Sequence, residues 1–110
     1  MLIADVVNAL VKKDHVALSE CLTDKCRMFD YCPMYIEKEN FHIYGSCAVE
    51  MFYHNQFVLR GLEAYDPVID DERTANLYIS YGGTIIHAKV MIEKYSPVDG
   101  KIMELMIRPA

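Results

Sequence analysis

The chain has 110 residues, of which 53% are hydrophobic and 25% are charged, a composition typical of a globular protein and unlike that of disordered chains. Its formal net charge of −5 argues against binding to a nucleic-acid backbone. A short apolar run without a basic segment meets Asp5, which predicts neither a signal peptide nor a membrane span. We therefore expect a single domain over residues 1–110, located in the cytoplasm.

Two helices are predicted at the beginning of the chain. Between Leu2 and Val11 the apolar residues recur at spacings of three and four, which is typical of an amphipathic helix. Asp14 is suited to cap a second, short helix over residues 15–22, and the apolar side chains of that helix would pack back on the first. This pattern predicts a helical hairpin.

Two strands and a third helix are predicted next. Residues 26–32 and 35–44 have the composition of strands joined around Pro33, and the second is polar enough for a sheet edge. Residues 45–59 have the apolar pattern of a helix that begins near Gly45 and Ser46. The four cysteines form no C-x-x-C pair, so we expect reduced, buried thiols.

The rest of the chain is predicted to be a curved antiparallel sheet. Four strands are expected over residues 62–70, 73–81, 84–95 and 101–109, and the turns between the last three are short, which favours antiparallel pairing. Along residues 84–95, alternate side chains such as Ile86 and Val90 would face inward, and His87 and Lys89 outward. The fold class predicted is α+β.

The order of these elements and four segments resemble the nuclear transport factor 2-like superfamily, which includes SnoaL-like polyketide cyclases, ketosteroid isomerases and scytalone dehydratase. The segments are KKDHVAL, RMFDY, YGSCAVEMFYHN and DGKIMEL. The resemblance implies a cone-shaped sheet wrapped around three helices, a cystatin-like α+β barrel. It also implies an apolar pocket open at one end of the cone and, usually, a homodimer.

Asp30, which lies in the otherwise apolar stretch MFDYC, is the main catalytic candidate. Its position resembles that of the aspartate that moves a proton in ketosteroid isomerases, with Tyr31 in place of the proline that often follows. A desolvated carboxylate would have a raised pKa and would be a better base at neutral pH. The alternative is that Asp30 accepts backbone N–H bonds in the turn before Pro33.

Other features of the isomerase resemblance are missing, because the positions of its oxyanion donors fall on the apolar residues Val6 and Met91 or Ile92. His42 and Tyr44 share one face of a strand and would meet Asp30 as a proton relay, or else would form a half-exposed edge. We expect a small, neutral, mostly apolar ligand to contact Met28, Cys32, Met51, Tyr53, Ile86 and Val90. No histidine spacing or glycine-rich motif predicts a metal or a cofactor.

Two functions remain open from the sequence: an enzyme that moves a proton through Asp30, and a non-catalytic module for ligand binding or dimerisation. We also expect a homodimer through the outer face of the sheet, where apolar anchors alternate with opposite charges. The residues predicted on that face are Tyr78, His87, Lys89, Met91, Glu93, Ile102, Glu104, Met106 and Arg108.

Overall fold

The computed structural model describes residues 1–110 and has three helices, a short 3-10 helix and six strands. The elements are α1 (Leu2–Lys12), α2 (His15–Glu20), β1 (Leu22–Asp30), η1 (Pro33–Ile36), β2 (Phe41–Tyr44), α3 (Ser46–Val58), β3 (Leu62–Ile69), β4 (Thr74–Tyr81), β5 (Thr84–Tyr95) and β6 (Ile102–Pro109). The predicted α+β class is confirmed.

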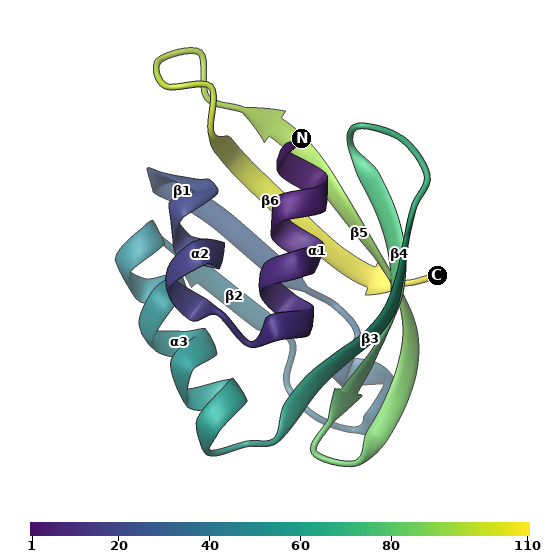
Figure 1. The fold of residues 1–110 in the computed structure, drawn as a ribbon. Helices are drawn as coiled ribbons and strands as arrows, with labels where there is room; N and C mark the ends of the chain where they lie inside the picture. The colour runs from purple at the N-terminus through teal and green to yellow at the C-terminus, as the bar shows by residue number, and fades with distance from the viewer.

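All six strands form one curved sheet in the order β2-β1-β6-β5-β4-β3. Adjacent strands of the sheet pair antiparallel, except that β1 and β6 run parallel. The three helices lie against one side of the sheet, as Figure 1 shows. None of these helices has the length and apolar character needed to cross a membrane.

Residues at the helix ends account for where α1 and α2 begin and end. Helix α1 buries the apolar side of its periodic pattern and ends at Lys12, after which Lys13 caps it with a left-handed φ of 57°. The predicted cap is confirmed, because the Asp14 carboxylate accepts the Ala17 N–H at 3.0 Å. Helix α2 ends at Glu20, two residues earlier than predicted, and β1 begins at Leu22.

Of the strand predicted over residues 35–44, only the last four residues, Phe41–Tyr44, form a strand. Pro33 begins the 3-10 helix η1, for which its fixed φ is suited, and the Asn40 side chain accepts the Met34 N–H at 3.0 Å. These local bonds turn the chain before it reaches Phe41, where pairing with β1 begins. The prediction that all four cysteines are buried is wrong for Cys47, which is exposed on α3.

The outer face of the sheet differs from the prediction at one end of β6. The pairing of β5 with β6 shifts between Glu104 and Ile102, which is the signature of a β-bulge. A bulge reverses the alternation of side chains, so Ile102 is fully buried although it was predicted to face outward. Glu104, Met106 and Arg108 keep their predicted places, and Met106 pairs with Met91.

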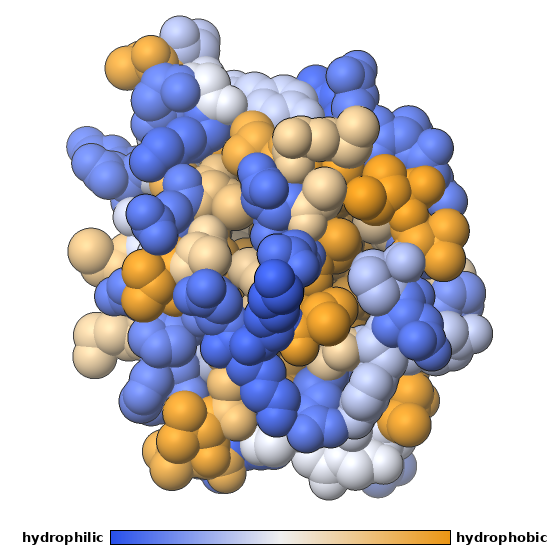
Figure 2. All heavy atoms as spheres, viewed as in Figure 1, coloured by the Kyte–Doolittle hydropathy of each residue, from blue (hydrophilic) through white to orange (hydrophobic).

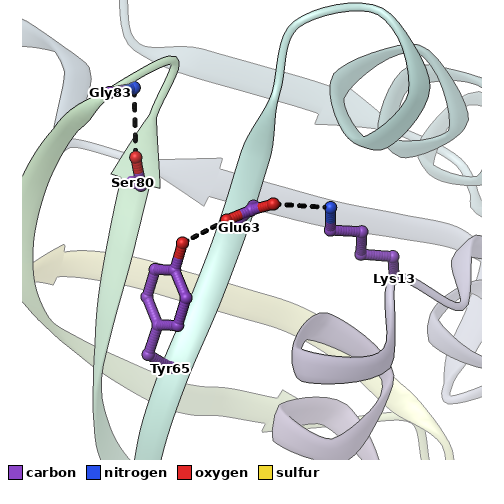
Figure 3. Close-up of polar contacts among 5 residues, drawn as sticks. All are labelled: Lys13, Glu63, Tyr65, Ser80 and Gly83. Atoms are coloured by element: carbon purple, nitrogen blue, oxygen red, sulfur yellow. Dashed lines mark hydrogen bonds and ion pairs between the residues drawn. The ribbon is translucent and has the colours of Figure 1, made fainter.

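Figure 3 shows polar contacts at β3 and in the turn between β4 and β5. Glu63 accepts from Lys13 Nζ at 2.9 Å and from the Tyr65 hydroxyl, which ties the end of α1 to β3 but adds little stability at the surface. In the turn between β4 and β5, the Ser80 hydroxyl accepts the Gly83 N–H at 3.1 Å. On the helix-bearing side, hydrophilic atoms surround separate apolar patches, one of them over the C-terminal end of α3 (Figure 2).

Candidate functional site

Asp30 lies at the end of β1 with only 1% of its surface exposed, and both of its carboxylate oxygens have partners. Oδ1 accepts the Cys32 N–H at 2.9 Å, and Oδ2 accepts from the Tyr81 hydroxyl at the end of β4. The first bond is the backbone contact expected from the non-catalytic alternative. The second joins two strands that are far apart in the sequence and makes Asp30 part of a buried polar cluster.

The environment of Asp30 shifts its titration toward neutral pH. Burial raises the pKa of the carboxyl from 3.8 to about 6, although the bonds from Tyr81 and Cys32 act in the opposite direction. Burial and the nearby Asp30 charge raise the pKa of the Cys32 thiol to about 12 and hold the pKa of Tyr81 well above its ordinary value. Asp30 is therefore the member of the cluster that exchanges a proton near neutral pH.

Aromatic rings fill the space between α3 and the sheet beside this cluster. The ring centroids of Tyr53 and Phe52 are 5.3 Å apart. The centroid of Phe41 lies 4.7 Å from that of Phe52 and 6.0 Å from that of Tyr81. The buried Tyr53 hydroxyl has no hydrogen-bond partner. Burial and then the charge of Asp30 raise the pKa of that hydroxyl well above its ordinary value, so it remains protonated.

A hollow of about 490 Å³, which we call the mouth pocket, opens above the cluster. It is lined by residues from the C-terminal end of α3, the η1 region and the β4–β5 turn. The end of α3 and the β4–β5 turn lie at the lower end of the molecule in Figure 1. The lining residues are Pro33, Lys38, Phe41, Gln56, Leu59, Arg60, Tyr81 and Gly82. Phe41 pairs with Asp30 across the strands and Tyr81 bonds to it, so two lining residues are direct neighbours of Asp30, which itself does not line the pocket.

Close backbone contacts shape one wall of the mouth pocket. Lys38 Nζ donates to the Tyr81 carbonyl oxygen at 3.0 Å, which fixes the residues after η1 to the end of β4. Gly82 has a left-handed φ of 70°, and a Cβ there would lie 3.3 Å from the Arg60 carbonyl oxygen. A glycine at this position therefore allows the β4–β5 turn to approach the end of α3.

The largest hollow of the surface lies elsewhere, with a volume of about 790 Å³. It is formed by the first half of β1, Tyr44 and the β5–β6 turn, and it includes no residue of the Asp30 cluster. No group of three or more His, Cys, Asp or Glu side chains is placed to hold a metal ion. The mouth pocket is therefore the hollow that adjoins the candidate acid.

The predicted relay from Asp30 to His42 and Tyr44 is wrong. Asp30 pairs with Phe41 and Phe29 pairs with His42, so Asp30 and His42 lie on opposite faces of the sheet. The His42 ring packs against Phe29 and Tyr31 on the outer face, and Tyr44 is 62% exposed there. These residues form the half-exposed edge that was the alternative.

The six predicted ligand contacts do not meet around a hollow. Met28, Cys32, Tyr53 and Val90 are buried in the packed core, and Ile86 is half-buried beside it. Met51 points away from the core and is 68% exposed. None of the five principal hollows is lined by any of the six, and their role in binding stays a prediction.

The sequence did not identify four residues that line the mouth pocket, namely Lys38, Gln56, Arg60 and Tyr81. The alternation Leu77, Ile79, Tyr81 along β4 is the signal that would have placed Tyr81 inward. Lys38 and Arg60 carry no such signal, because each belongs to a connection between elements and they come together only in the folded chain.

No protein-family model and no curated protein sequence matches the chain. Several solved structures are similar to it. A nuclear transport factor 2-like protein of unknown function from Cytophaga hutchinsonii has a TM-score of 0.64 at 17% identity, with 99% of this chain and 87% of that chain covered. A SnoaL-like protein of unknown function from Burkholderia thailandensis has a TM-score of 0.64 at 12% identity, covering 98% of this chain and 91% of the other.

A candidate ketosteroid isomerase from Kribbella flavida is also similar, with a TM-score of 0.61 at 17% identity over 99% of this chain and 75% of that chain. At these identities the likeness establishes the fold and no activity. The chain therefore has the nuclear transport factor 2-like, cystatin-like fold, as the sequence segments predicted.

Proposed function

We propose that this chain is a non-catalytic binding protein that holds a small, partly apolar molecule in the mouth pocket of its nuclear transport factor 2-like fold. The observation that carries the proposal is the burial of Asp30, whose oxygens are both occupied while the pocket stops at Phe41 and Tyr81. A general base must reach the proton that it abstracts, and here the buried Asp30 carboxylate does not line the hollow. The pocket itself has a volume within the range of small-molecule sites.

We expect a tryptophan at Gln56 to block binding, because Gln56 lines the mouth pocket and the larger ring would occupy it. The measurement is a titration with two probes that share one apolar body, 4-phenylbutanol and 4-phenylbutyrate, followed by NMR. We expect Gln56→Trp to weaken binding of either probe by about tenfold or more, equal to about 1.4 kcal/mol.

Met51→Trp is the matched control, because Met51 is on the same helix and its side chain is exposed away from the pocket. This variant is expected to bind both probes like the original protein. Binding that survives Gln56→Trp unchanged would place the site elsewhere, and the proposal would fail.

Proton transfer through Asp30 is a second candidate function, supported by the carboxyl pKa of about 6 and by the unpartnered Tyr53 hydroxyl. It requires Tyr81 to move aside so that a ketone in the mouth pocket reaches Asp30. The test is exchange of the hydrogens next to the carbonyl of 2-tetralone in deuterium oxide. Faster exchange with the original protein than with Asp30→Asn would support catalysis, and equal rates would reject it.

We further propose a symmetric homodimer through the outer face of the sheet. Phe29, Met106 and Met91 form an apolar row across three strands, and Tyr44 and Tyr78 add exposed aromatic surface. The Arg27–Glu104 ion pair at 2.8 Å lies beside this row, so opposite charges are available to a second copy related by a two-fold axis. A stable interface would bury about 800 Å² on each subunit.

Met106→Glu is expected to convert this dimer to a monomer, because it places a charge at the centre of the apolar row. The measurement is sedimentation velocity at tens of micromolar. Val98→Glu, in the exposed turn between β5 and β6, is the control and should leave the dimer intact. A monomeric original protein, or a dimer unaffected by Met106→Glu, would contradict the proposal.

A further inference from the structure

We infer that the mouth pocket selects an organic acid, with its carboxylate held between Lys38 and Arg60 and its apolar body against Phe41 and Leu59. This inference rests on the proposed binding function and specifies the chemical class of the ligand. It follows from the charges that line the pocket, from their lack of ionic partners, and from the apolar surface between them.

Both cations of the pocket lack a carboxylate partner. The two ion pairs of the structure are Lys13–Glu63 and Arg27–Glu104, and neither includes Lys38 or Arg60. The Lys38 ammonium has three donors, and its one hydrogen bond goes to the uncharged carbonyl oxygen of Tyr81. The lining of the hollow therefore carries two positive charges that no carboxylate compensates.

No acidic residue lines the mouth pocket. Glu37 and Glu39 flank Lys38 in the sequence but are exposed outside the lining. The whole chain carries a net charge of −5, so its general field repels anions, and salt screens that field beyond about 8 Å at physiological ionic strength. An anion in the mouth pocket would thus be attracted by the nearby charges of Lys38 and Arg60, and the Gln56 amide can donate a further hydrogen bond to it.

The same hollow offers apolar surface for the remainder of the ligand. Phe41, Tyr81 and Pro33 contribute to its lining, and so does Leu59, which is 72% exposed. An exposed leucine in the lining would lose contact with water when an apolar group binds. A molecule that combines one carboxylate with a short apolar body satisfies both parts of the pocket.

The test compares 4-phenylbutyrate with 4-phenylbutanol, which differ in the anionic group, by calorimetry at low salt. We expect the acid to bind about tenfold more tightly than the alcohol, as a hydrogen bond to a charged group would provide. Lys38→Gln and Arg60→Gln should each remove most of that preference, because each should lower the affinity for the acid more than the affinity for the alcohol. Lys94→Gln, an exposed lysine of β5 outside the pocket, should change neither affinity.

Each alternative predicts a different result. If Arg60 serves only to complement the C-terminal end of α3, Arg60→Gln will lower thermal stability without changing the ratio of the two affinities, and the inference will be rejected. Equal binding of acid and alcohol, both blocked by Gln56→Trp, would overturn the inference but keep the proposed function. Binding of neither probe at the mouth pocket would reject both.

Discussion

At neutral pH the ionised Asp30 carboxyl is expected to lower the free energy of unfolding by on the order of 3 kcal/mol, because its pKa rises from 3.8 to about 6 on folding. Replacing Asp30 with asparagine is expected to remove this pH-dependent cost. A raised pKa means that the folded state binds the proton more tightly than the unfolded state. The free energy of unfolding therefore falls as pH increases from about 4 to 6, and the whole penalty is present above that range. Asparagine does not titrate and avoids this penalty.

Urea unfolding of both proteins at about pH 4.5 and about pH 7.5 measures the effect. The stability of Asp30→Asn relative to the original protein should increase between the two conditions. Asp71 and Asp99 are exposed acids whose pKa values are lowered by hydrogen bonds, and they act in the opposite direction. Both proteins contain them, so they cancel in the difference. An equal loss of stability at both pH values would show that Asp30 ionises normally and acts as a backbone acceptor.

Tyr81→Phe is expected to reduce the free energy of unfolding by about 1–3 kcal/mol, because it leaves the buried Oδ2 of Asp30 without its donor. The Tyr81 hydroxyl also lowers the pKa of Asp30, so its removal raises that pKa further. The loss should therefore be larger at about pH 7.5 than at about pH 4.5.

Tyr78→Phe is the matched control for this variant, because Tyr78 is on the same strand and 41% exposed, with its ring stacked on His87. Its hydroxyl makes no hydrogen bond within the chain, so the change should stay within about 0.5 kcal/mol. Equal effects of the two substitutions, or an effect of Tyr81→Phe that does not vary with pH, would contradict the role assigned to Tyr81.

The sequence pattern predicted the fold well because helices and strands depend on local periodicity. The strand over Thr84–Tyr95 and the cap at Asp14 were both found in this way. The parallel pairing of β1 with β6 was not predicted, because it joins segments from the two halves of the chain. The burial of Ile102 was missed for a similar reason, since a bulge depends on how two strands pair.

The candidate site was predictable only in part. Asp30 was identified because a carboxylate in an apolar strand is unusual, but its partner Tyr81 lies 51 residues away. The relay through His42 failed because one position of register moves a side chain to the other face of the sheet. Lys38 and Arg60 meet at the mouth pocket only through the close approach of the β4–β5 turn to α3.

A map of amide chemical shifts during titration with 4-phenylbutyrate tests the central claim most directly, because it locates the ligand without assuming a reaction. Binding at the mouth pocket predicts the largest changes at Lys38, Leu59, Arg60 and Gly82, which come from three separate segments of the chain. The largest changes at Lys25, Val98 and Asp99, which line the hollow of about 790 Å³, would contradict the account. So would the absence of any change at millimolar probe.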